Sequence, residues 1–158
     1  MRLHDLPGYL HMLQVRAGEA AIPAANAMGL DYEDELKRVL TRRSHAPGTR
    51  TPAPPGTPPA RVSGALAGSV TTRRATTPVV ATAVSGPRLP PRDYVQEYGG
   101  EMSARPGNLM HYIYDGPRYS EHVVVPARPY ARPTALAMMA DGRLAQAAAD
   151  AFYKAMWG

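Results

Sequence analysis

The chain has 158 residues, which fits one domain or one small domain with extensions. Its 17 prolines and 14 glycines, with one Phe and one Trp, predict a modest core that gains part of its order from neighbouring subunits. The absence of cysteine excludes disulfides, thiolate metal sites and cysteine nucleophiles. The net charge of +5 comes almost entirely from arginine, which suits partners carrying carboxylates or phosphates, although a GC-rich genome also raises Arg, Ala, Pro and Gly together.

Residues 1–43 are predicted to form an N-terminal helical region. Apolar residues recur at spacings of three and four over 8–21 and again over 23–43. We expect Pro23 to separate the two helices, because proline is best tolerated in the first turn of a helix. Acidic residues precede basic ones in the second helix, which permits an Asp34–Arg38 ion pair four residues apart.

Residues 44–60 form a proline-rich linker or arm in this prediction. The density of proline excludes a helix or a central strand there and favours an extended, polyproline-like chain. Such a segment could bind a proline-recognising domain. A linker, or an arm that lies across a neighbouring subunit, is the interpretation that we favour.

Residues 61–158 are predicted to form a small α+β domain. The pattern predicts a short helical turn at 61–70 with Ser63 as its cap, and a second helical turn at 94–98. Strands are expected at 70–76, 78–84, 108–114 and 121–125, the first two as a hairpin. Helix formers over 134–156 predict a long C-terminal helix behind Pro133. The fold class is therefore α+β: N-terminal helices, a small and mostly antiparallel sheet of about four strands, and a long C-terminal helix.

Three sequence patches, at 61–70, 94–100 and 126–136, occur in an order that resembles a known family. It is the tail-completion (neck, or head–tail joining) family of long-tailed bacteriophages, which is itself similar to the virion morphogenesis proteins of Mu-like phages. The matching residues are Ser63, Gly64, Leu66, Ser69 and Val70; Tyr94, Glu97, Tyr98 and Gly99; and Ala127, Arg128, Pro129, Tyr130, Arg132 and Pro133. The chain departs from the pattern at Val95, Gly100 and Thr134, and the 44–60 and 101–125 segments are longer than is typical of the family.

The resemblance implies a structural virion protein, assembled in the host cytoplasm, that forms a ring of six or twelve copies at the head–tail junction. Its partners would be further copies of itself, the adjacent neck or stopper protein, and the tail-terminator and tail-tube proteins. Genomic DNA would pass through the ring in sequence-independent contact. The interface residues that it implies are Ser63, Gly64, Leu66, Ser69, Tyr94, Glu97, Gly99, Arg128, Tyr130 and Arg132.

The second and third patches are expected to be joined to each other. Proline residues push Arg128 and Arg132 toward extended backbone at the start of the C-terminal helix. Glu97 is a carboxylate partner for either guanidinium. An ion pair between Glu97 and one of these arginines would tie the middle patch to the helix start, within or between subunits.

The sequence does not contain the motifs of a common active site. Nucleophile-elbow, phosphate-loop, dinucleotide-binding and zinc-helix spacings are missing. We therefore expect no enzyme activity, no catalytic residue, no metal and no cofactor. No apolar run is long enough to span a bilayer, and we expect no membrane association. The alternative function is that of a basic nucleic-acid-binding protein without catalytic activity, using arginines such as Arg42, Arg61 and Arg73.

Overall fold

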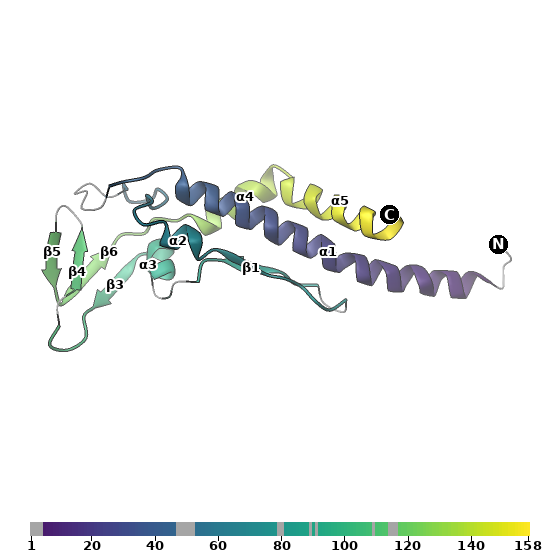
Figure 1. The fold of residues 1–158 in the computed structure, drawn as a ribbon, viewed down its shortest axis with the longest axis horizontal. Coiled ribbons are helices and arrows are strands. Elements are labelled where there is room, and N and C mark those ends of the chain that lie inside the picture. Colours follow the sequence, from purple (N-terminus) through teal and green to yellow (C-terminus); the bar gives the residue numbers. More distant parts are fainter. Residues whose placement is uncertain are drawn as a thin grey trace. The chain divides into compact units, whose positions relative to one another are not determined.

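The computed structural model describes residues 5–46, 53–78, 81–88, 90, 92–108, 110–113 and 117–158. The fold is α+β, as predicted (Figure 1). Its helices are α1 (Leu6–Thr41), α2 (Ala65–Gly68), α3 (Arg92–Tyr98), α4 (Ala131–Ala140) and α5 (Arg143–Trp157). Its strands are β1 (Thr71–Arg73), β2 (Val84–Gly86), β3 (Gly100–Ser103), β4 (Met110–Ile113), β5 (Pro117–Ser120) and β6 (His122–Val125).

The N-terminal region is one helix, and the predicted break at Pro23 is wrong. α1 continues through Pro23, which lies in its interior. A proline there removes one backbone N–H donor and crowds the preceding turn, which destabilises the helix. Contacts made by the residues around Pro23 must offset this loss of stability. Ala20 is buried on one side of the proline, and Asn26 and Gly29 are hydrogen-bonded to other parts of the chain on the other side.

The strands pair two by two and do not form one four-stranded sheet. β3 pairs antiparallel with β6, from Gly100 opposite Val125 to Ser103 opposite His122. β4 pairs antiparallel with β5, and β1 pairs with β2 (Figure 1). The predicted hairpin of 70–76 and 78–84 is corrected, because the partner of β1 is Val84–Gly86, further along the chain. β3 and β5 were not predicted.

The C-terminal helical region is two helices and not the single helix that was predicted. α4 ends at Ala140, and α5 begins at Arg143. Between them Gly142 has a φ of 77°, a left-handed conformation that favours glycine. The Asp141 carboxylate accepts the backbone N–H of Arg143 at 3.0 Å and its Nε–H at 2.8 Å. These bonds hold the pKa of Asp141 below its ordinary value of 3.8, the backbone N–H being the largest cause.

The chain divides into two compact units. The first comprises 1–33, 72–85 and 137–158, and the second comprises 34–71 and 86–136. Buried apolar residues of the first unit are Ala20, Ala75, Met138 and Met156. Those of the second unit are Leu36, Leu40, Ala53, Ala67, Val70, Val95 and Tyr130. The second unit also buries the charged side chains of Glu97 and Arg128, and it contains all three patches of the sequence.

In the first unit, hydrogen bonds fasten the β1–β2 region to α1. The side-chain amide of Asn26 accepts the backbone N–H of Ala75 at 2.7 Å and donates to its carbonyl at 3.2 Å. The hydroxyls of Thr72 and Ser85 both donate to the carbonyl of Gly29, at 3.0 Å and 2.9 Å. A side chain at Gly29 would collide with Thr72 and with other atoms around it, so glycine permits this close approach.

Candidate functional site

A buried carboxylate from α3 caps the start of α4. Glu97, only 7% exposed, accepts the backbone N–H groups of Tyr130 at 2.7 Å and Ala131 at 2.9 Å through Oε2. Its Oε1 accepts the N–H of Arg132 at 2.9 Å. The first N–H groups of a helix have no partner inside the helix, and the positive end of the helix dipole favours an anion there. Glu97 therefore caps the start of α4 from a distant part of the chain.

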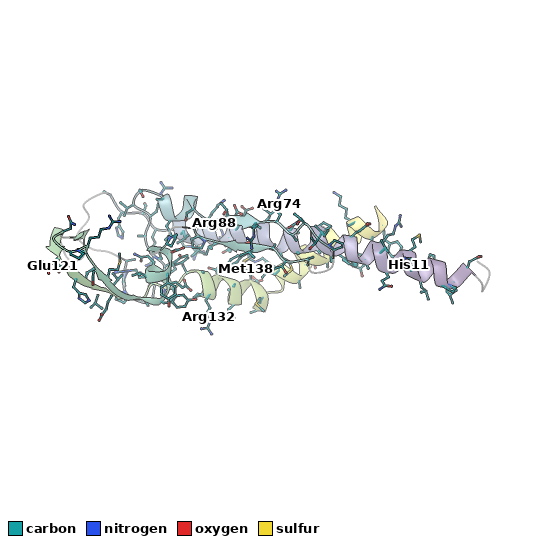
Figure 2. All side chains as sticks on the ribbon, turned by 90° about the horizontal axis from the view of Figure 1, so that it is seen from below. His11, Arg74, Arg88, Glu121, Arg132 and Met138 are labelled. Atoms are coloured by element: carbon teal, nitrogen blue, oxygen red, sulfur yellow. The ribbon has the colours of Figure 1, made fainter. Side chains whose placement is uncertain are left out.

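Glu97 joins the second and third patches, but not through the predicted ion pair with an arginine, because the groups that bind it at the helix start are backbone amides. Arg132 contributes its N–H, while its side chain is exposed and projects from the ribbon (Figure 2). Arg128 lies inside the unit at 5% exposure. Its Nε donates to the carbonyl of Ala53 at 2.8 Å, and its backbone N–H donates to the carbonyl of Gln96 at 2.7 Å.

Arg128 and its neighbour also hold the proline-rich segment against the unit. Besides the bond from Arg128 to Ala53, the N–H of Gly56 donates to the carbonyl of Ala127 at 2.9 Å. Ala53 is buried. Residues 53–56 of this segment are thus anchored to their own chain. The reach of this linker or arm across a neighbouring subunit stays a prediction, and residues 47–52 lie outside the described part.

Gly99 allows the second and third patches to touch. It follows α3 with a φ of 72°. A Cβ at this position would lie 2.8 Å from the backbone nitrogen of Ala127 and 3.0 Å from the carbonyl oxygen of Val125. Those neighbours are backbone atoms, which cannot swing away as a side chain could. Glycine is therefore required here both for the conformation and for the space.

Tyr130 completes the contact from the buried side. Its side chain is 1% exposed, and its hydroxyl donates to the carbonyl of Asp93, at the beginning of α3, at 3.3 Å. The hydroxyl of Thr134 donates to the carbonyl of Tyr130 at 2.6 Å. Tyrosine gives this position an apolar ring for the core and a polar tip for the backbone.

The first patch forms the turn around α2. Gly64, at a φ of 80°, is the N-cap residue, and the hydroxyl of Ser63 accepts the N–H of Ala65 at 3.3 Å. Ser63 was predicted as the cap and stands one residue earlier. At the other end the hydroxyl of Ser69 donates to the carbonyl of Leu66 at 2.7 Å and accepts the N–H of Arg88 at 3.3 Å.

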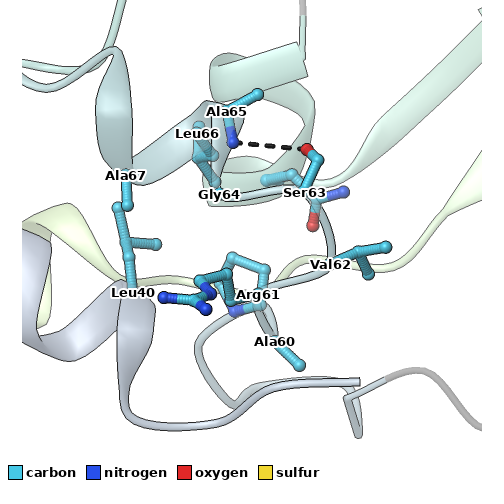
Figure 3. Close-up of a pocket in the computed structure, with 11 residues that line it drawn as sticks. Leu40, Ala60, Arg61, Val62, Ser63, Gly64, Ala65, Leu66 and Ala67 are labelled. Atoms are coloured by element: carbon cyan, nitrogen blue, oxygen red, sulfur yellow. Dashed lines mark hydrogen bonds between the residues drawn. The ribbon is translucent and has the colours of Figure 1, made fainter. Parts of the chain in front are cut away.

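A pocket of about 190 Å³ connects the first patch with the second (Figure 3). Most of its wall comes from 59–67, closed by Leu40 from the end of α1 and by Gln96 from α3. Its side chains are mainly small or apolar, with Arg61, Ser63 and Gln96 as the polar ones. The side-chain oxygen of Gln96 is buried and has no hydrogen-bond partner within the described residues. The three patches therefore form one cluster, which we call the three-patch cluster.

The predicted interface residues divide into an inner and an outer group. Glu97, Arg128 and Tyr130 are buried, so their side chains stabilise the unit itself. Ser63, Tyr94 and Arg132 are exposed, while Gly64, Leu66, Ser69 and Gly99 are half-buried. Tyr94 is 65% exposed, and its ring lies 4.9 Å from that of Tyr98, which is 61% exposed. The exposed members remain candidates for contact with a partner.

Several residues of the cluster were missed in the sequence. Ala53 and Ala127 take part through their backbone atoms, and Gln96 through both its carbonyl and its side chain. A backbone contact leaves no signal in the type of residue. The acceptor role of Glu97 toward a helix start more than thirty residues away also has no local motif, unlike an ordinary capping box.

The described residues offer no group of three or more His, Asp or Glu that could hold a metal ion. None of the helices in the described part is long and apolar enough to cross a membrane. Comparison with protein-family models, with curated proteins and with solved structures gives no match.

Proposed function

We propose that this chain is a structural virion protein that forms a ring at the head–tail junction of a tailed bacteriophage and leaves a passage for DNA. The observation that carries the proposal is the three-patch cluster. Residues that resemble the tail-completion family are scattered from 63 to 133 in the sequence, yet they meet in one unit. In this proposal the cluster has no catalytic role and no cofactor, and it holds a rigid surface for neighbouring subunits.

Exposed apolar side chains support an assembled state. Five large ones occupy the first turns of α1, each between 37% and 55% exposed: Leu6, Tyr9, Leu10, Met12 and Val15. Tyr94 and Tyr98 add an exposed aromatic pair beside the cluster. Large apolar side chains left exposed are candidates for contact with a partner. A closed ring of identical subunits would cover such surfaces by heterologous contacts.

Electron microscopy of particles made with the gene disrupted tests the role. Full heads beside separate, unjoined tails are expected, and complementation from a plasmid should restore joined virions. Normal joined particles from the disrupted gene would overturn the proposal.

A pair of tyrosine variants tests the surface. Tyr94 and Tyr153 are both 65% exposed, but only Tyr94 belongs to the three-patch cluster. Tyr94→Ser should reduce plaque formation in the complementation assay by about tenfold or more, because each ring would lose this contact in every subunit. Tyr153→Ser should complement normally. Equal complementation by the two variants, with equal protein levels, would remove Tyr94 from the interface.

Nucleic-acid binding without a place in a virion is the second candidate. The observation that favours it is the number of exposed arginines, among them Arg42, Arg43 and Arg61. If particles made with the gene disrupted are normal joined virions, nucleic-acid binding becomes the function to test. The two candidates share one element, contact with a nucleic-acid backbone.

A further inference from the structure

Acidic residues are missing from a long central stretch of the chain. Residues 36–92 contain nine arginines and one lysine but no aspartate or glutamate, so all 13 acidic residues lie outside the stretch. A GC-rich genome raises the arginine content throughout a protein, but it does not remove acids from one segment. The stretch therefore has the charge pattern of a surface that meets a polyanion.

The structure brings part of this charge together at the end of α1. The N–H of Arg61 donates to the carbonyl of Arg43 at 2.7 Å, and the N–H of His45 donates to the carbonyl of Arg61 at 2.8 Å. These bonds form a parallel bridge between Ser44 and Arg61. Arginines that are far apart in the sequence are thereby held next to each other within the second unit.

The side chains of this group are available to a partner. Arg42, Arg43 and Arg61 are exposed, and none of them forms an ion pair within the part of the chain that the structure describes. Arg38, one turn earlier, is different because it binds Glu35 at 2.7 Å and is thereby neutralised. That contact also corrects the predicted Asp34–Arg38 pair. We call Arg42, Arg43 and Arg61 the arginine group.

We propose that the arginine group binds the phosphate backbone of double-stranded DNA without reading its sequence. A guanidinium group can donate two parallel hydrogen bonds to the oxygens of one phosphate. The hydroxyls of Ser44 and Ser63, which are close to these arginines in the sequence, are further donors to phosphate. This inference extends the proposed function, because it names the side chains that would face DNA. It does not depend on the ring, since the arginine group belongs to a single subunit.

The composition of the stretch favours a duplex over a single strand. Proteins that hold single-stranded DNA or RNA stack the bases on aromatic side chains. Residues 36–92 contain no Phe, Tyr or Trp. An acidic protein is the other polyanion to consider, but protein interfaces are normally rich in aromatic residues, which this stretch lacks. The absence of aromatic residues therefore favours the phosphate backbone of a duplex over both alternatives.

The binding of a fluorescent 30-base-pair duplex of random sequence to the full chain, measured by anisotropy over a series of NaCl concentrations, tests the inference. Three phosphate contacts give a slope of about −2.7 for log K against log salt, equivalent to roughly a fortyfold loss of affinity between 50 and 200 mM. The triple variant R42A/R43A/R61A should lose most of that slope and at least about tenfold in affinity at 50 mM.

The matched control removes the same charge elsewhere. Arg16, Arg105 and Lys154 are exposed and lie outside the acid-free stretch. R16A/R105A/K154A should keep the slope and bind within about twofold of the parent chain. Equal losses in the two triple variants would show attraction by net charge alone and overturn the inference. Circular dichroism and urea unfolding of each variant separate loss of binding from loss of fold.

Competition decides among the polyanions. Unlabelled duplex should displace the probe at lower nucleotide concentration than single-stranded DNA or poly-glutamate of equal charge. Stronger competition by poly-glutamate would assign the surface to an acidic protein, and stronger competition by single strands would contradict the duplex assignment. A negative binding result leaves the head–tail role standing, because disruption of the gene tests that role independently.

Discussion

The carboxylate of Glu97 and the backbone N–H of Tyr130 lie 2.7 Å apart although 33 positions separate them in the chain. This bond and its two companions, to Ala131 and Arg132, hold the end of α3 against the start of α4. Loss of the carboxylate would leave three buried or half-buried N–H groups without an acceptor. The start of α4 and the end of α3 would then no longer be joined by these hydrogen bonds.

Glu97→Ala should lower the free energy of unfolding by about 3 kcal/mol, because charged hydrogen bonds at a helix N-terminus are lost together. Glu97→Gln keeps one acceptor oxygen and should cost about half as much. Urea unfolding followed by circular dichroism measures both. Glu101→Gln, which changes an exposed carboxylate nearby, is the control and should stay within about 0.5 kcal/mol of the parent. A similar cost for the two glutamine variants would contradict the capping role.

Gly99→Ala should cost more than a positive φ alone can explain. The left-handed conformation costs an alanine about 1–2 kcal/mol, and the new Cβ would also press on the backbone of Ala127. Gly107 has a φ of 79° and open space where a Cβ would lie, so Gly107→Ala reports the cost of φ by itself. The difference between the two unfolding free energies measures the close approach. No difference would mean that the backbone at Ala127 can move aside.

Asn26→Ala should expose the backbone of Ala75. The side-chain amide of Asn26 makes two hydrogen bonds with that residue, and each is worth about 1 kcal/mol. We expect a loss of about 2 kcal/mol in stability and faster hydrogen exchange at the N–H of Ala75. Asn108→Ala, which removes an exposed amide, is the control. Unchanged protection of Ala75 in the Asn26 variant would show that the amide does not hold the β1–β2 region.

Asp141 should titrate below 3.8, and the depression should survive the loss of its guanidinium neighbour. A carboxyl whose pKa is lower in the folded state stabilises the fold above its unfolded pKa. That stability is lost as the pH falls through the lowered folded value. Because the backbone N–H of Arg143 is the largest cause, Arg143→Gln should raise the pKa only part of the way toward 3.8. Carbon-detected NMR titration of the Asp141 carboxyl measures both values, and complete restoration in Arg143→Gln would contradict this order of causes.

Local patterns predicted the two short helical turns and failed where distant contacts decide. The helical turns near Ser63 and Tyr94 have caps or breakers in their own sequence, and both are confirmed. β3, with the sequence Gly-Glu-Met-Ser, has little strand propensity and exists because β6 lies beside it. The proline of α1 is tolerated for a similar reason, since residues on either side of it are held by other parts of the chain.

One missed feature did have a readable signal. The dipeptide Asp141-Gly142 interrupts a run of helix formers, and glycine after an aspartate is a common breaker. The alanine-rich segments on both sides of this dipeptide favour a helix strongly, so the sequence pattern predicted one continuous helix. In the three-patch cluster, residue types pointed to Glu97 and the helix start but not to the backbone N–H groups that bind its carboxylate. The backbone contacts of Ala53 and Ala127 likewise depend on how the chain folds and leave no trace in its sequence.

The contacts between α3 and α4 fix both ends of the segment that connects these two helices. Glu97 and Gly99 hold its beginning, Ala127 and Tyr130 hold its end, and β3 to β6 lie between. Lengthening a flexible loop between fixed ends costs little, about 0.6 kcal/mol for each doubling. The connections between these strands can therefore gain or lose length during evolution without moving the helix that follows. Under the proposed function, such a subunit could change the tip of its β region to suit a new neighbour while its core stays the same.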